Sequence, residues 1–166
     1  TFVSEENPAG LLFVSGDMTP GSRAIVREVN VEAEGGFPLA FGGYGTGWLE
    51  QSKIRAEGTG AVYASTLDND VNYLFHNAIT AESSSRANGF LSDAGEIFAI
   101  NNSFYMNGTT SSVVFRLRVA NREIRLVNNT LLSATPSAYL ADLASDDVDV
   151  TLVHNLVGVA DGDPDE

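Results

Sequence analysis

The sequence predicts an all-β chain, folded as a right-handed parallel β-helix solenoid of about five or six coils with roughly 25 residues per coil. The main observation is a short apolar stretch ending in Asn, which recurs at intervals of 25, 27 and 26 residues. The copies are Tyr73–Ile79, Phe98–Phe104, Arg125–Leu131 and Thr151–Val157. Within them, apolar residues alternate with the two-residue period of a β-strand, and Gly, Asn, Asp and Ser interrupt the pattern.

Each repeat has room for three strands. One strand precedes the Asn, one follows it, and a further apolar stretch lies upstream. The upstream stretches are Pro38–Phe41, Ala61–Ala64, Gly89–Leu91, Val113–Leu117 and Ala138–Ala141. Two weaker copies precede the four clear ones: Trp48–Ile54 with Ser52 in the Asn position, and Ile25–Val31 with a register uncertain by one residue. Helical repeats need longer units and a period of 3.6, so they do not fit.

The recurring asparagines are expected at the turn between the second and third strands of each coil. They are Asn77, Asn102, Asn129 and Asn155. A sharp turn often needs a positive φ, which Asn tolerates better than other non-glycine residues, and stacked Asn side chains can form a hydrogen-bonded ladder. Three glycosylation patterns offer a competing interpretation, at Asn101–Ser103, Asn107–Thr109 and Asn128–Thr130. The regular spacing favours the turn.

The chain divides into three segments. Residues 25–160 form the predicted β-helix, and residues 1–24 are expected to cap its open end, where core and strand edges would otherwise be exposed. The acidic tail Asp161–Glu166 is expected to be flexible. Its spacing resembles the start of a calcium-binding loop, but the full pattern is missing, so neither Ca²⁺ nor another cofactor is predicted.

Composition excludes several function classes. A formal charge of −13 disfavours binding to nucleic acid or anionic lipid. The absence of Cys excludes disulfides, zinc held by thiolates and a thiol nucleophile. No apolar run approaches the roughly 20 residues of a membrane span. Because the chain begins at Thr1, we expect a processed or excised segment.

At this point the repeated Asn-ended strands resemble a known group. Over about residues 25–160 they are similar to the pectate-lyase-like superfamily of right-handed parallel β-helices. The superfamily includes polysaccharide lyases and hydrolases, epimerases, phage tailspikes and adhesins, so the resemblance implies an architecture rather than one activity. It also implies a secreted, periplasmic or cell-surface protein with a polysaccharide as a candidate partner.

The resemblance further implies that a ligand would lie along the face formed by the first strand of each coil. Alignment on the Asn position predicts one inward stack, made of Phe41, Tyr63, Leu91, Phe115 and Leu140. It also places four charged residues near one another across three coils: Asp93, Arg116, Arg118 and Asp142. In a lyase, such arginines would hold a substrate carboxylate while a base removes a proton, and two carboxylates could serve glycoside hydrolysis.

The same four residues have a simpler interpretation. Arg and Asp on neighbouring coils commonly form exposed ion pairs worth about 0–1 kcal/mol. We therefore treat these four residues as a candidate ligand-binding face and assign no catalytic residue. Lys53 and Arg55 are a second basic pair, and their alternation predicts that both face solvent.

The remaining chemically distinctive residues are predicted to be structural. His76 and His154 occupy the same turn position three coils apart, about 15 Å, which is too far to share a metal ion. Trp48 and Phe104 lie at positions that alternate toward the core, so packing is their expected role.

Two functions from different classes remain open. The first is a non-catalytic module of a secreted or cell-surface protein, with a face that binds carbohydrate or a partner. The alternative is a small polysaccharide lyase or hydrolase acting on acidic glycans, or a fragment of one. Exposed end coils could also stack between chains, which would give a homodimer.

Overall fold

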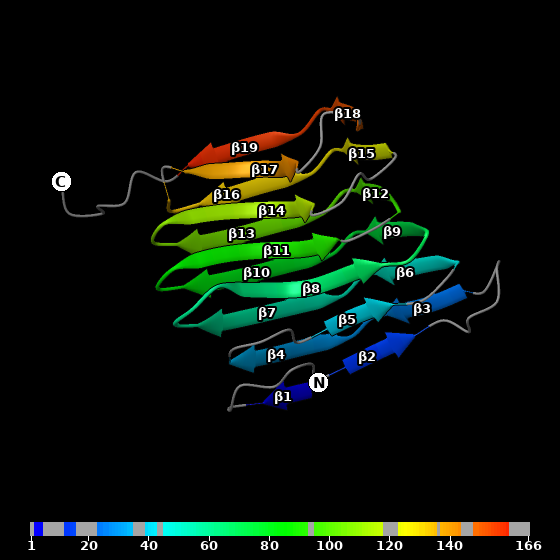
Figure 1. Cartoon of the computed structure of the whole chain (residues 1–166), viewed down its shortest axis with the longest axis horizontal. Coiled ribbons are helices and arrows are strands. Elements are labelled where there is room, and N and C mark those ends of the chain that lie inside the picture. Colours follow the sequence, from blue (N-terminus) through cyan, green and yellow to red (C-terminus); the bar gives the residue numbers. More distant parts are fainter. Residues whose placement is uncertain are drawn as a thin grey trace.

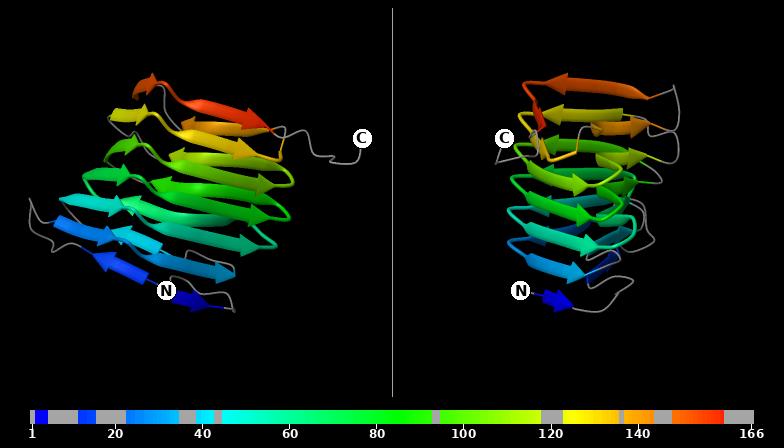
Figure 2. Two further views of the ribbon diagram at one scale, coloured as in Figure 1. Left: turned by 180° about the vertical axis from the view of Figure 1, so that it is seen from behind. Right: turned by 90° about the vertical axis from the view of Figure 1, so that its left-hand side faces the viewer.

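The computed structural model describes residues 2–4, 12–15, 23–34, 39–42, 45–92, 95–117, 123–135, 137–143 and 148–159. These residues form strands joined by turns, with no helix among them. The strands wind into a solenoid whose coils stack along one axis (Figures 1 and 2). Every strand pairs in parallel with the strand one coil away, so the prediction of an all-β parallel solenoid is confirmed.

Three parallel sheets run along the solenoid, and each coil contributes one strand to each sheet. The first-strand sheet contains β2 (Leu12–Ser15), β5 (Leu39–Gly42), β8 (Val62–Asp68), β11 (Arg86–Ser92), β14 (Ser111–Leu117) and β17 (Ala138–Leu143). The second-strand sheet contains β3 (Arg23–Arg27), β6 (Thr46–Glu50), β9 (Val71–Phe75), β12 (Glu96–Ile100), β15 (Glu123–Val127) and β18 (Asp149–Val153). The third-strand sheet contains β1 (Phe2–Ser4), β4 (Asn30–Glu34), β7 (Lys53–Gly58), β10 (Ala78–Ser83), β13 (Ser103–Gly108), β16 (Thr130–Ser133) and β19 (Leu156–Val159).

The core fills the space enclosed by the three sheets. In the second-strand sheet from β3 to β15, and in β4, β7, β10, β13 and β16 of the third-strand sheet, buried and less buried residues alternate as the period of two requires. Phe90 and Phe115 stack in neighbouring coils with ring centroids 5.4 Å apart, and Phe104 meets Phe115 edge-on at 5.7 Å. The inward position predicted for Phe104 is thereby confirmed.

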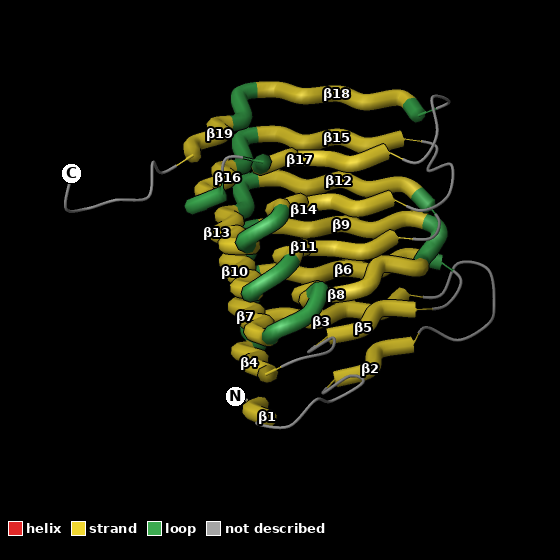
Figure 3. Tube along the Cα trace, turned by 60° about the vertical axis from the view of Figure 1, so that its left-hand side comes forward, coloured by secondary structure: helices red, strands yellow, loops and turns green. Residues whose placement is uncertain are grey.

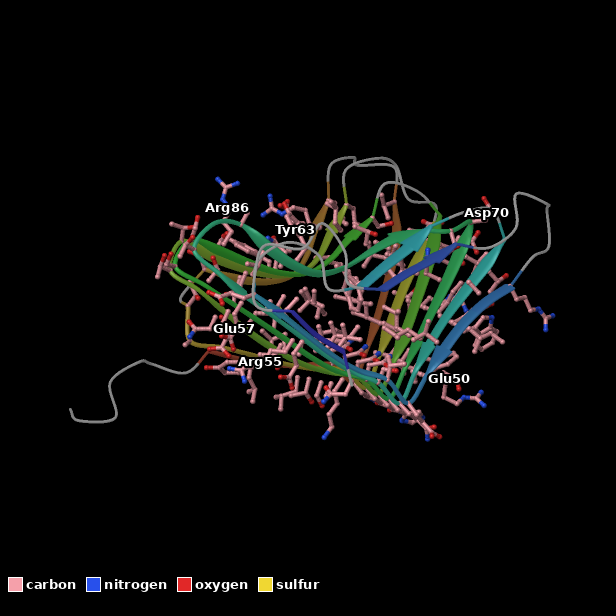
Figure 4. The ribbon with its side chains drawn as sticks, turned by 90° about the horizontal axis from the view of Figure 1, so that it is seen from below. Glu50, Arg55, Glu57, Tyr63, Asp70 and Arg86 are labelled. Carbon is pink, nitrogen blue, oxygen red and sulfur yellow. The ribbon has the colours of Figure 1, made fainter. Side chains whose placement is uncertain are left out.

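The first-strand sheet departs from this alternation in the middle of its strands. In β11 the six consecutive residues 87–92 are buried, and in β14 the four residues 112–115 are; among them Phe90, Val114 and Phe115 belong to the hydrophobic core. Gly89 fits there because a Cβ would approach the carbonyl oxygen of Val114 to 2.7 Å. Such a local break in alternation bends a strand. Viewed along the axis, the strands on the side of Tyr63 curve inward between two corners (Figure 4).

A ladder of buried Asn side chains links the coils at the turn between the second and third strands. The Nδ2 atom of each Asn donates to the Oδ1 atom of the Asn one coil further on. The distances are 2.9 Å from Asn77 to Asn102, 2.9 Å from Asn102 to Asn129 and 3.0 Å from Asn129 to Asn155. Ser52 precedes this ladder, and its backbone N–H donates to Asn77 Oδ1. The predicted ladder is confirmed.

The predicted backbone conformation of these asparagines was wrong by one residue. Positive φ angles occur at the position just before the ladder: Glu28 (54°), Gln51 (49°), His76 (55°), Asn101 (56°), Asn128 (53°) and His154 (51°). The physical reason is that the left-handed residue turns its side chain to solvent, while the next side chain enters the core and forms the ladder. The turns lie above one another in a column (Figure 3).

The pairing also settles the register of the weakest repeat. Asn30 pairs with Lys53, so Val29 occupies the ladder position one coil before Ser52. At the start of the chain, β1 pairs with β4 and β2 pairs with β5, which adds strands to two of the sheets. The tail, residues 161–166, lies outside the described part of the chain.

Candidate functional site

The inward bend of the first strands shapes the outer surface of their sheet, which we call the first-strand face. Two rows of residues cross this face, each row set by the parallel register. One row contains Tyr63, Asn88, Val113 and Tyr139, and the next contains Thr66, Leu91, Arg116 and Asp142. Tyr63 lies on this side of the solenoid, whereas Arg55 and Glu57 lie on another (Figure 4).

Two of the four predicted site residues meet on this face. Arg116 on β14 and Asp142 on β17 are partners in the strand register, and Arg116 Nη2 lies 3.4 Å from Asp142 Oδ2. Asp142 is exposed, whereas Arg116 is half-buried. Asp93 and Arg118, the other two predicted residues, lie outside the described residues.

Sequence reasoning missed Asn88, which positions Arg116. The Oδ1 atom of Asn88 accepts a hydrogen bond from Arg116 Nε at 3.0 Å, and its Nδ2 atom donates to the carbonyl oxygen of Val62 at 3.0 Å. Asn88 is fully buried, so its amide cannot turn without losing both partners. The guanidinium is therefore held between Asn88 and Asp142. The available signal was an amide residue between Ala87 and Gly89, directly before a predicted apolar stretch.

A hollow of about 270 Å³ opens beside this arginine. Its lining residues are Ser111, Val113, Arg116, Tyr139, Ala141 and Asp142. Tyr139 keeps 53% of its surface exposed, so it offers an aromatic surface next to a fixed guanidinium and a carboxylate. This combination can contact an apolar ring face and hydrogen-bond hydroxyl groups at the same time.

The predicted inward stack on this sheet was wrong. Phe115 stacks on Phe90, and it is Leu91 that shares the outer row with Arg116. Tyr63 belongs to the other outer row. The error arose because the connection between first and second strands varies in length: Phe115 precedes its ladder Asn by two residues more than Phe90 does. An alignment that counts a fixed number of residues back from the ladder Asn therefore groups first-strand residues that are not in register.

The other two predicted members of that stack also occupy different places. Phe41 pairs with Leu67, two positions beyond Leu39, which is the β5 residue aligned with Phe115. Leu140 is only partly buried, and the residue in register with Phe115 is Ala141.

The inward position predicted for Trp48 was also wrong. Trp48 lies on the outer surface of the second-strand sheet, between the buried Gly47 and Leu49. Its ring stacks on Tyr73 at 4.3 Å, and Tyr73 stacks on Phe98 at 5.1 Å. The predicted packing role holds, since the rings pack on one another outside the core. Their faces are turned toward each other, which makes this stack a poor platform for a sugar ring.

Both histidines lie on the exposed turn column with positive φ, as expected for a polar turn position. Among the described residues, no group of three or more His, Cys, Asp or Glu side chains could hold a metal ion. Lys53 and Arg55 face solvent as predicted, and Arg55 bonds to Glu82 at 3.1 Å. In the described part of the chain, no helix is long and apolar enough to cross a membrane.

Comparison with known proteins adds no relative: no family model matches the chain, and neither a curated protein nor a solved structure matches it.

Proposed function

We propose that this chain is a carbohydrate-binding module of a secreted or cell-surface protein, and that its ligand lies along the first-strand face. The observation that carries the proposal is the fixed Arg116 beside the exposed Tyr139. Arg116 is held by Asn88 at 3.0 Å and by Asp142 at 3.4 Å, next to a hollow of about 270 Å³.

The chemistry of this hollow suits a sugar. A pyranose ring presents apolar C–H groups on its face and hydroxyl groups around its edge. The Tyr139 ring can cover the first, while Arg116, Asp142 and Ser111 can hydrogen-bond the second. Coils repeat about every 4.8 Å, and the exposed part of the two rows beside the hollow lies on β14 and β17, because Asn88, Leu91 and Val113 are buried, so a glycan would contact these two neighbouring coils.

Charge favours a neutral polysaccharide over an acidic one. The positive charge of Arg116 is already paired with the carboxylate of Asp142. The chain as a whole carries a formal charge of −13, which repels a polyanion such as a polyuronate. A neutral glycan has no such penalty. Arg116 can donate hydrogen bonds to its hydroxyl groups, and Asp142 can accept hydrogen bonds from them.

Binding without reaction also fits the ion pair. Glycoside hydrolysis uses a pair of carboxylates, whereas the described lining of the hollow contains one, Asp142, which lies beside Arg116. The proposal therefore departs from the alternative of a lyase or hydrolase on acidic glycans.

Calorimetric titration with neutral and acidic oligosaccharides tests the proposal. We expect binding of a neutral oligosaccharide and a loss of affinity of about tenfold or more in Tyr139→Ala. Tyr105→Ala is the matched control, because Tyr105 is also exposed but lies on the third-strand sheet. Failure of every neutral glycan to bind would refute the proposal, as would an ultraviolet-absorbing unsaturated product formed from an acidic glycan.

A further inference from the structure

The turn column, formed by the residues of positive φ directly before the ladder positions, contains two acceptor patterns for Asn-linked glycosylation. They are Asn101–Ser103 and Asn128–Thr130. In each pattern the first Asn takes the positive φ of the turn, and the second Asn forms the ladder. Only the first Asn of such a pattern accepts a glycan, so the ladder and a glycan use different residues.

Both acceptor side chains are free in the folded chain. Asn101 and Asn128 are exposed, and neither side chain hydrogen-bonds to any described residue. The adjacent ladder asparagines, Asn102 and Asn129, are only 2% and 1% exposed. A glycan on Nδ2 of either acceptor would therefore extend into solvent and break no hydrogen bond of the described structure.

The hydroxyl groups two residues later are not required by the fold. In the parallel register, the position of Ser103 and Thr130 is held in the other coils by residues without a hydroxyl group: Asn30, Lys53, Ala78 and Leu156. Neither Ser103 Oγ nor Thr130 Oγ1 hydrogen-bonds to a described residue. A hydroxyl residue thus occurs in the two coils whose turn residue is Asn, and in none of the other four described coils. The acceptor pattern explains this coincidence, and strand pairing does not.

The third pattern in the sequence differs, because there the fold itself uses the hydroxyl group. Thr109 Oγ1 donates to the carbonyl oxygen of Ser84 at 2.6 Å. The backbone N–H of Gly108 donates to Ser112 Oγ at 3.1 Å, and Asn107 is half-buried. The structure therefore explains Thr109 without a glycan, and Asn107 serves as an internal comparison for the other two sites.

We propose that Asn101 and Asn128 are attachment sites for Asn-linked glycans, added when the chain is exported. The donor is an oligosaccharide joined through its first sugar to a lipid phosphate or pyrophosphate, and a transferase of the cell catalyses the step. Nδ2 of the Asn attacks C1 of that sugar and forms the C–N bond. The bond from C1 to the phosphate oxygen breaks, and the lipid phosphate leaves with the bonding electron pair. A basic group of the transferase takes the proton lost from Nδ2.

Glycans on the turn column would leave the proposed carbohydrate site open. Glu50 ends β6 directly before the turn column, and it lies at a different corner of the solenoid from Tyr63 on the first-strand face (Figure 4). Glycosylation requires export of the chain, as the proposed function does, but it does not require carbohydrate binding. A chain without glycans that still binds a neutral oligosaccharide would refute the attachment sites alone.

Peptide mass spectrometry of the whole chain, recovered from its natural source, tests the attachment sites. We expect a glycan on the peptides that contain Asn101 and Asn128, and none on the peptide that contains Asn107. An amidase that removes the glycan converts each modified Asn to Asp and so marks its position. Unmodified Asn at both 101 and 128 would overturn the proposal, as would a glycan on Asn107 alone.

Variants secreted from a host cell that glycosylates Asn show whether the pattern is responsible. Ser103→Ala should remove the glycan from Asn101 and leave Asn128 modified, and Thr130→Ala should do the reverse. Asn101→Gln is matched to the fold, because Gln51 holds the same turn position with a φ of 49°. It should lose one glycan and keep the unfolding temperature of the deglycosylated wild-type chain. A folded Ser103→Ala variant that still carries the glycan on Asn101 would contradict the assignment.

Discussion

Asn129 accepts two hydrogen bonds from Asn102 through a single atom. The backbone N–H of Asn102 lies 3.0 Å from Asn129 Oδ1, and the side-chain Nδ2 lies 2.9 Å from the same oxygen. Asn102 Nδ2 also donates to the carbonyl oxygen of Leu74, which belongs to the coil on the opposite side. One side chain therefore joins three successive coils.

Removal of this side chain should strongly destabilise the solenoid. In Asn102→Ala, the backbone N–H and Nδ2 of Asn77 lose their acceptor, and the buried carbonyl of Leu74 loses a donor. An unsatisfied buried polar group costs about 1–3 kcal/mol, so we expect the free energy of unfolding to fall by about 3 kcal/mol or more. Urea denaturation measures this change.

Asn155→Ala is the matched control for that variant, because Asn155 is the last described member of the ladder and is only partly buried. Its loss should cost less than the loss of Asn102. The loss in free energy of unfolding for Asn102→Ser should lie between the losses for Asn102→Ala and Asn155→Ala, since Ser52 already serves in the ladder position of an earlier coil. Equal losses for Asn102→Ala and Asn155→Ala would contradict the role of the ladder as a link between buried coils.

The position before the ladder makes a different demand, on backbone conformation. His76 has a φ of 55°, and Asn fills the same position in the next two coils with φ values of 56° and 53°. Asn tolerates the left-handed region well, whereas a β-branched side chain does not. We therefore expect His76→Val to lower the free energy of unfolding by about 1–2 kcal/mol, and His76→Asn to leave it nearly unchanged. Thermal unfolding of both variants checks this, and equal stability would contradict it.

The sequence was sufficient to predict the architecture because the ladder Asn recurs in four successive coils. Asn77, Asn102 and Asn129 follow their second strands without insertions, so their spacing directly reports the length of one coil. The sequence could not decide which of two adjacent residues takes the positive φ. Asn101 and Asn128 each directly precede a ladder asparagine, so both candidate residues are Asn and both tolerate a positive φ.

The candidate site was harder to predict, for a reason that lies in the loops. The connection from first to second strand differs in length between coils, so the register on the first-strand sheet could not be transferred from the ladder. Arg116 and Asp142 were nevertheless predicted to lie near each other, and they form an ion pair. Asn88 could not be found in this way, because its role depends on an Arg one coil away and 28 residues later.

The bend in the first strands gives a test of close packing. In Gly89→Ala, the new Cβ would lie 2.7 Å from the carbonyl oxygen of Val114, which is backbone and cannot move aside freely. We expect a loss of about 1–3 kcal/mol, as for other overpacked sites. Gly60→Ala is the control, because a Cβ there meets nothing within 4 Å, and it should be neutral or slightly stabilising. Chemical denaturation distinguishes the two, and equal effects would exclude the close approach.

The aromatic stack on the second-strand sheet should contribute to stability and not to ligand binding. Tyr73 is its central ring, in contact with Trp48 at 4.3 Å and with Phe98 at 5.1 Å. Tyr73→Ala removes both contacts and half-buried ring surface, so the free energy of unfolding should fall by about 2–3 kcal/mol. Because the stack uses the ring faces, and because it lies on a different sheet from Tyr139, oligosaccharide affinity should remain at the wild-type value. Denaturation and calorimetry on the same variant separate the two effects. If Tyr73→Ala kept wild-type stability but no longer bound the oligosaccharide, the ligand would bind at this stack and not on the first-strand face.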